Sequence, residues 1–262
     1  MNNQPIGILD SGVGGLSILR EITKKLPNES VIYVADSKNC PYGTKTKEEI
    51  YKLARRLVEF LVKKDCKLIV VACNTITVSC IDSLRIDFLG LPIIGTVPVI
   101  KTASEKTKNK KIGILSTSKT AKSQYQKDLI QKFAGDCDVL NLGNDNIVPM
   151  IEKRTARRKI IRLLRHEFQP FIEKGIDTLV LGCSHFPLIA DLITEIIGNE
   201  VEILDSGGAI ARQVERILRA ENLLSGSKIS KQMFYTTGNK ENFGIIAESL
   251  FWKIGCEFNS RD

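Results

Sequence analysis

The chain has 262 residues, of which 43% are hydrophobic and 26% charged, and its formal net charge is +8. This length allows a substantial buried core, which excludes a mini-protein, and no apolar run approaches the roughly 18 residues that a membrane-spanning helix needs. The first residues, MNNQPIGIL, lack a basic region followed by a long apolar core, so no secretory signal is expected.

Short apolar runs alternate along the chain with longer segments of helical period. The runs predict strands at 6–9, 31–35, 68–72, 111–115, 178–181 and 202–204. The segments between them predict helices, for instance at 47–63 and 119–133, and the basic segment 153–166 has the pattern of an amphipathic helix. Strands separated by such helices form parallel crossovers, so the expected fold class is α/β.

The cysteines and the positive charge limit the possible functions. An odd number of cysteines, seven, in a chain too long to need disulfide bonds favours reduced thiols in a cytoplasmic protein. No C-x-x-C pair occurs, and the only histidines are His166 and His185, so no metal is expected. Neither basic segment, 106–111 or 153–166, contains interleaved aromatic residues, which disfavours a nucleic-acid partner.

Two pairs of similar segments indicate an internal repeat. PIGILDSGVGG (5–15) resembles KIGILSTSKTA (111–121), and KLIVVACNT (67–75) resembles DTLVLGCSH (177–185). The pairs occur in the same order and at nearly the same spacing, which predicts two similar α/β domains that face each other. A rough twofold relation would bring Cys73 and Cys183, each at the carboxyl end of a strand, to one cleft between the domains.

Two thiols in one cleft allow several chemistries. Cys73 alone could be a small buried hydrophobic residue, and the pair could form a disulfide. His185 lies two residues after Cys183, so a thiol hydrolase is another possibility, although it leaves Cys73 without a role. The chemistry that uses both is inversion of a stereocentre, in which one thiolate removes a proton and the other thiol delivers one to the opposite face.

Two loops could hold a small zwitterionic substrate. DSGVGG (10–15) follows a strand and offers Ser11 and backbone N–H groups to a carboxylate, or it is a plain turn with Asp10 as a helix cap. It is not a G-x-G-x-x-G sequence, which disfavours a dinucleotide. The loop that begins CPYG at Cys40 could place Tyr42 over the substrate and offer the N–H of Gly43, or it could be a simple turn.

The motifs together resemble one family over nearly the whole chain. GILDSGVGGLS (7–17), D-S-x-x-C-P-Y-G (36–43), VVACNT (70–75), GCSHFPLI (182–189) and ILDSG (203–207) stand in the order found in bacterial glutamate racemases, of the cofactor-independent aspartate/glutamate racemase superfamily. The resemblance implies that Cys73 and Cys183 are the catalytic acid/base thiols and that no cofactor is needed. It also implies a substrate site lined by Asp10, Ser11, Tyr42, Gly43, Asn74, Thr75, Ser184 and His185. Glu152 and Thr117 fall on positions that resemble further site residues, while Phe186 stands where the family usually has a tyrosine.

The same resemblance implies an architecture and a cellular role. The expected domains are 1–97 plus 207–262 and 98–206, with the active site in the cleft between them. The expected activity interconverts L-glutamate and D-glutamate in the cytoplasm and supplies D-glutamate for peptidoglycan, usually as a homodimer, and thereby serves cell-wall biogenesis and cell shape. The alternatives are a racemase of aspartate or another acidic amino acid and, last, a non-enzymatic protein with a basic binding surface.

Overall fold

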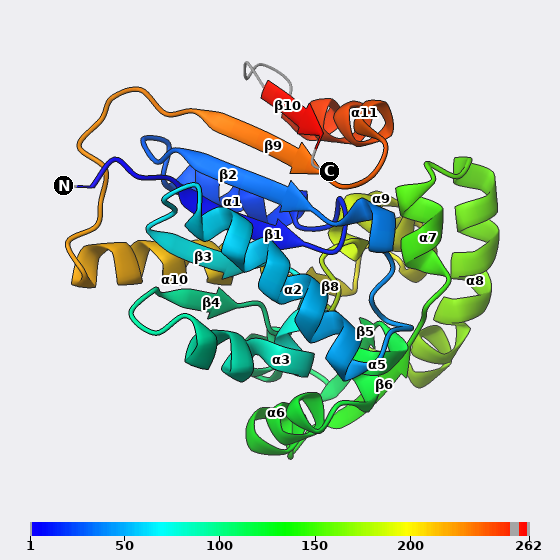
Figure 1. The fold of residues 1–262 in the computed structure, drawn as a ribbon. Coiled ribbons are helices and arrows are strands. Elements are labelled where there is room, and N and C mark those ends of the chain that lie inside the picture. The colour runs from blue at the N-terminus through cyan, green and yellow to red at the C-terminus, as the bar shows by residue number, and fades with distance from the viewer. Residues whose placement is uncertain (1, 252–256, 261–262) are drawn as a thin grey trace.

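The computed structural model describes residues 2–251 and 257–260, and its strands form two separate parallel sheets (Figure 1). The first sheet has the order β10-β9-β2-β1-β3-β4, and the second has the order β6-β5-β7-β8. The strands of the first sheet are β1 (Ile6–Asp10), β2 (Val31–Ala35), β3 (Leu68–Val71), β4 (Ile93–Gly95), β9 (Gln232–Thr236) and β10 (Glu257–Ser260). Those of the second are β5 (Lys111–Ser116), β6 (Asp138–Gly143), β7 (Thr178–Leu181) and β8 (Glu202–Leu204). We call the parts built around these sheets the first lobe and the second lobe.

Helices connect the strands and cover both sheets. They are α1 (Leu16–Lys25), α2 (Lys47–Val62), α3 (Asn74–Asp87), α4 (Ile100–Lys106), α5 (Ser118–Lys122), α6 (Gln124–Ala134), α7 (Ile147–Glu152), α8 (Arg157–Lys174), α9 (Ala190–Ile197), α10 (Gly207–Ala220) and α11 (Lys240–Leu250). Two short 3₁₀ helices, η1 (Ser37–Asn39) and η2 (Phe186–Ile189), lie in loops. Every strand pair is parallel, because each connection between neighbouring strands is a crossover, and the predicted α/β class is confirmed.

The two sheets repeat one arrangement. In the first lobe, β1 lies between β2 and β3, and β4 follows β3; in the second lobe, β5 lies between β6 and β7, and β8 follows β7. Strand β1 therefore corresponds to β5, and β3 corresponds to β7, as the sequence repeat predicted. In strand order, the first sheet differs by two strands, β9 and β10, added beside β2.

Several elements differ from the sequence predictions for local reasons. The helix expected at 119–133 is two helices, because Ser123 is extended (φ −64°, ψ 142°) and its side chain accepts a hydrogen bond from the N–H of Gln126 as the N-cap of α6. The basic helix begins at Arg157 and continues to Lys174, beyond the expected segment. Strands β4, β6, β9 and β10 were not predicted: β4 has three residues, and β6 is half-exposed with polar residues in it.

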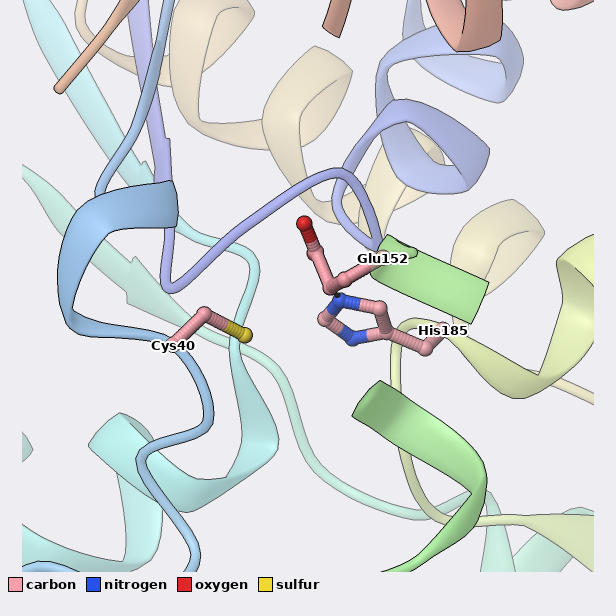
Figure 2. Close-up of side chains that lie close together, drawn as sticks. All are labelled: Cys40, Glu152 and His185. Atoms are coloured by element: carbon pink, nitrogen blue, oxygen red, sulfur yellow. Dashed lines mark hydrogen bonds and ion pairs between the residues drawn. The ribbon is translucent and has the colours of Figure 1, made fainter. Parts of the chain in front are cut away.

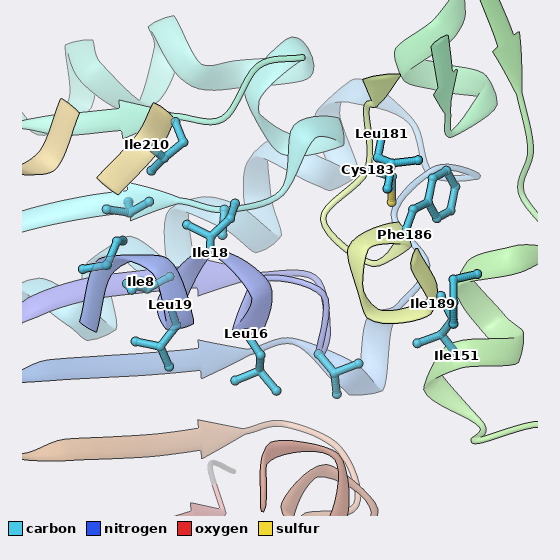
Figure 3. Packing of buried hydrophobic residues seen from close by; sticks show 14 of the residues in the cluster. Ile8, Leu16, Ile18, Leu19, Ile151, Leu181, Cys183, Phe186, Ile189 and Ile210 are labelled. Carbon is cyan, nitrogen blue, oxygen red and sulfur yellow. The ribbon is translucent and has the colours of Figure 1, made fainter. Parts of the chain in front are cut away.

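One hydrophobic cluster joins the two lobes. Ile8, Leu16 and Ile18 of the first lobe belong to the same buried cluster as Leu181 and Phe186 of the second (Figure 3). The chain crosses between the lobes after β4 and again after β8, and the two crossings are tied together where the Ser206 hydroxyl donates to the backbone oxygen of Val97 at 2.6 Å. The domain boundaries predicted at 97/98 and 206/207 lie in these crossings, and the division into domains stays a prediction. Among the described residues, no helix is both long and apolar enough to cross a membrane.

Candidate active site

Cys73 and Cys183 occupy equivalent positions in the two lobes. Cys73 follows β3 and is the N-cap residue of α3, and Cys183 follows β7 just before η2. Their exposed fractions are 5% and 7%. Because the carboxyl ends of parallel strands border ligand sites, both thiols stand where the fold places reactive groups.

The environment of Cys73 keeps its thiol protonated. Burial, followed by the nearby charge of Asp10, raises the pKa of Cys73 to about 12. Opposing these effects, the N–H of Ile76 at the start of α3 and the Ser11 hydroxyl, 3.6 Å from the sulfur, both lower the pKa because they stabilise the thiolate. The charge of Cys183 also raises the pKa of Cys73, so the two sulfurs lie within electrostatic reach of each other.

Asp10 joins the glycine-rich loop to the second lobe. One oxygen accepts a hydrogen bond from the N–H of Gly12 at 2.8 Å, and the other accepts from the Ser184 hydroxyl at 2.9 Å. Burial raises the pKa of Asp10, although the positive charge of His185 opposes this. The alternative role of Asp10 as a helix cap is wrong, because Gly15 is the N-cap residue of α1.

A chain of three side chains leads away from Cys183. The Cys183 sulfur lies 4.0 Å from Nδ1 of His185, and Nε2 of His185 lies 2.6 Å from Oε1 of Glu152. Burial would lower the pKa of the His185 imidazole, but hydrogen bonds with Cys183, Cys40 and Glu152 outweigh it, so the pKa is raised well above its ordinary value. Glu152 also accepts a hydrogen bond from the N–H of Val13 at 2.7 Å, which fixes the carboxylate against the glycine-rich loop.

The glycine-rich loop needs glycine where it meets this chain. A β-carbon at Gly12 would clash with the carboxylate of Glu152, and one at Gly14 would clash with the imidazole of His185. The sequence DSGVGG thus lets the first lobe approach the second closely, and a bulkier loop would separate them.

The other predicted site residues have partners in both lobes. Tyr42 is buried, and its hydroxyl donates to Asp36 at 2.5 Å, while Gly43 faces Thr117 of the second lobe. The Thr75 hydroxyl lies 3.0 Å from that of Thr117, which is a further direct link between the lobes. Asn74 is buried at the start of α3, where its side-chain amide donates to the backbone oxygen of Thr96 at 3.4 Å.

The position of Cys40 beside the site does not follow from the sequence. Its sulfur lies beside Glu152 and His185, and one ligand atom from each of the three residues falls within 4.8 Å of the other two (Figure 2). The only signal in the sequence was the place of Cys40 before the Pro-Tyr-Gly loop, because its two neighbours come from distant parts of the chain. The hydrogen bond from Tyr42 to Asp36, only 6 residues earlier in the chain, was not predicted for a different reason: the loop was interpreted as a substrate loop or a simple turn, without a role for Asp36.

Fold and site together indicate a class of protein. Two parallel-sheet lobes each present one buried thiol, and each thiol has its own polar neighbours: Ser11 and Asp10 for Cys73, His185 for Cys183. Two buried thiols with separate polar neighbours are the acid and base that a two-base isomerase needs to invert a stereocentre.

Comparisons with known proteins agree with this class. The family described as Asp/Glu/Hydantoin racemase matches residues 6–214, and the chain belongs to this family. A glutamate racemase from Ralstonia pickettii is 40% identical over 236 residues, which are 90% of this chain and 83% of the relative. The crystal structure of a glutamate racemase isoform from Bacillus anthracis has a TM-score of 0.90 and 31% identity, and the match covers 100% of this chain and 98% of the other. A glutamate racemase from Francisella tularensis, solved in complex with D-glutamate, has a TM-score of 0.86 and 28% identity, with coverage of 100% and 98%.

Proposed function

We propose that the protein interconverts L-glutamate and D-glutamate by proton transfer between the substrate Cα and two thiols. The observation that carries the proposal is the equivalent placement of Cys73 and Cys183 in the two lobes of a chain that belongs to a racemase family. Relatives of high coverage are glutamate racemases, and the F. tularensis enzyme was solved with D-glutamate bound, which supports glutamate over aspartate as the substrate.

The two thiols take opposite roles in the two directions. In the proposed reaction Cys183 removes the Cα proton of L-glutamate and Cys73 delivers one to the opposite face, and the roles exchange for D-glutamate. The raised pKa of Cys73, about 12, supports its role as the proton donor for L-glutamate, because it keeps this thiol protonated before substrate binds. His185, held by Glu152, lies beside Cys183 and can stabilise its thiolate.

The polar residues around the thiols form the proposed substrate site. Ser11 and the N–H groups of the loop that follows β1 are suited to the substrate carboxylate, as are Asn74 and Thr75 at the start of α3. Ser184, joined to Asp10, and the Tyr42–Gly43 loop complete the site from either side. The domains proposed around it are 1–97 plus 207–262 and 98–206.

The proposed cellular role is to supply D-glutamate for peptidoglycan, in the cytoplasm and as a homodimer. Racemisation of aspartate or another acidic amino acid is the alternative reaction. Light scattering of the purified protein tests the dimer independently of the activity.

A circular dichroism assay without added cofactor tests the reaction. Starting from either L-glutamate or D-glutamate, the protein should abolish the circular dichroism signal, because both reactions end at the same mixture of enantiomers. It should act on L-aspartate far more slowly. Faster loss of the aspartate signal would contradict the proposal in favour of the alternative, and no loss with any of the three substrates would contradict racemisation.

A further inference from the structure

Cys40, Glu152 and His185 form a cluster whose thiol the proposed proton transfers do not use. Cys40 follows η1, Glu152 ends α7 and His185 precedes η2, and their side chains converge from these three turns (Figure 2). One ligand atom of each lies within 4.8 Å of the other two. Cys40 and Glu152 are partly buried, and His185 is 1% exposed. The cluster therefore lies just below the surface, with His185 as its most deeply buried member.

We propose that this cluster binds a zinc-type divalent cation. A thiolate sulfur, an imidazole nitrogen and a carboxylate oxygen are the three donor types that zinc prefers, and three protein ligands leave the fourth position for water. Ligand atoms around a tetrahedral zinc ion lie roughly 3.3–3.6 Å apart. Nε2 of His185 and Oε1 of Glu152 are now 2.6 Å apart, so binding requires that their hydrogen bond open by a small side-chain movement. The ion also displaces one proton from the imidazole and one from the Cys40 thiol, and both protons pass to solvent.

The surroundings hold the ligands in place. The N–H of Val13 donates to Oε1 of Glu152 at 2.7 Å, and the side chain of Asn242 donates to the backbone oxygen of Glu152 at 2.8 Å. These contacts fix the carboxylate and the end of α7, as hydrogen bonds around metal ligands commonly do.

A cavity gives the ion a route to the cluster. It has a volume of about 430 Å³, and its lining includes Cys40, Glu152, Val13, Lys153 and Asn242. Two of the three ligands therefore line the cavity, which also has room for the water at the fourth position. Lys153 is the cationic group in this lining, and it limits the affinity for the ion.

Bound zinc would inhibit racemisation. The ion takes the lone pair of the His185 imidazole and the charge of Glu152, so neither can assist Cys183. This consequence rests on the proposed function, whereas binding of the ion does not. The site would make the enzyme sensitive to free zinc.

Cobalt binding tests the site without an activity measurement. Metal-stripped protein titrated with Co²⁺ should bind one ion and show the charge-transfer absorption of a cobalt–thiolate bond. Cys40→Ser should lose this absorption and bind Zn²⁺ at least tenfold more weakly, and Cys137→Ser, at a cysteine outside the cluster, should match the unaltered protein. Glu152→Gln should weaken Zn²⁺ binding while it retains the thiolate absorption. This second variant keeps the test decisive if Cys40→Ser is unstable.

The same titration of Cys183→Ala shows which thiol binds. Retention of the absorption in Cys183→Ala and its loss in Cys40→Ser support the site, and the reverse pattern would overturn it.

With glutamate as substrate, Zn²⁺ should inhibit the unaltered protein reversibly. The activity of each protein is compared with its own activity without the ion. On that scale, the Zn²⁺ concentration that halves the activity should be at least tenfold higher for Cys40→Ser. Equal sensitivity of the two proteins would overturn the inhibitory role. If cobalt binds as expected and no glutamate is racemised, the proposed function fails and the metal site stands.

Discussion

At the scale of single residues, the account depends on which cysteines exchange protons with the substrate. Cys73→Ala and Cys183→Ala should each lower racemisation by at least about 100-fold, because each removes one of the two proton-transfer groups. Cys66→Ala is the matched control, since Cys66 is also a buried thiol in the same hydrophobic cluster as Cys73 but precedes β3, whereas Cys73 follows it. Turnover of both enantiomers by each variant, with far-ultraviolet circular dichroism to check the fold, gives the comparison. Near-normal activity of either of the first two variants would show that its thiol is dispensable.

Buried thiols also make the stability of the protein depend on pH. Burial raises the pKa of Cys66 from 9.0 to about 12, so the folded protein keeps a proton that the unfolded chain loses. The resulting stabilisation is complete below pH 9 and is lost as the pH rises from about 9 to 12. The free energy of unfolding should therefore fall in this range. Cys66→Ala should make the fall shallower, by at most about 1.4 kcal/mol per pH unit.

Urea unfolding at several pH values measures this slope. Cys137→Ala serves as the comparison, because Cys137 is only partly buried and packs at the margin of a hydrophobic cluster, whereas Cys66 is buried. If Cys66→Ala has the same pH dependence as the unaltered protein, burial does not suppress ionisation of this thiol in the folded state.

At the scale of elements, the glycine-rich loop after β1 is the part whose shape matters most. Gly14→Ala should reduce turnover by about 100-fold or more, because the added β-carbon must displace the imidazole of His185, and small misplacements of catalytic groups cost activity on this scale. Gly244→Ala is the control in α11, where nothing lies within 4 Å of the new β-carbon. It should retain activity and gain up to about 1 kcal/mol of stability. Equal activity of the two variants would mean that the close approach of the loop is not required.

The elements that could be predicted are those whose sequence pattern is set by burial alone. Strands β1, β2 and β3 are fully buried, so each is a continuous apolar run. Strand β6 is half-exposed and β9 alternates between buried and partly buried residues, so neither stands out from a loop or a helix in the sequence. The break between α5 and α6 depends on Ser123 acting as a cap, which hydrophobic period does not reveal.

The same distinction applies to the candidate site. The equivalent positions of Cys73 and Cys183 could be inferred because the repeat places them after corresponding strands. The positions of Glu152 and Thr117 came only from the resemblance to a family, since no local pattern marks them. The approach of Cys40 to His185 depends on how the two lobes pack, and nothing near Cys40 in the sequence encodes its distant neighbours.

At the scale of the whole molecule, the shared core predicts that the two lobes unfold together. Phe186 is 0% exposed and lies in the hydrophobic cluster that spans both lobes (Figure 3). Phe186→Ala should lower the free energy of unfolding by about 3–5 kcal/mol. Leu89→Ala, at a side chain that is 85% exposed, should change it by less than about 0.5 kcal/mol.

Calorimetry measures both the stability and the cooperativity. A single transition, in which the calorimetric and van't Hoff enthalpies agree, is expected for the unaltered protein. Two separate transitions, of which Phe186→Ala shifts only one, would mean that the lobes unfold independently and that the spanning cluster contributes little to their coupling.

The proton transfers themselves are tested most directly by racemisation in deuterium oxide. A thiol carries one proton, so the proton that one sulfur removes from Cα differs from the proton that the other sulfur delivers. Each product molecule should therefore carry solvent deuterium at Cα after its first turnover, while recovered substrate stays largely protiated at early conversion. Proton NMR of the Cα signal after chiral separation at low conversion gives both quantities. Substantial retention of the original hydrogen in the inverted product would contradict the two-thiol mechanism, even if both cysteines proved essential.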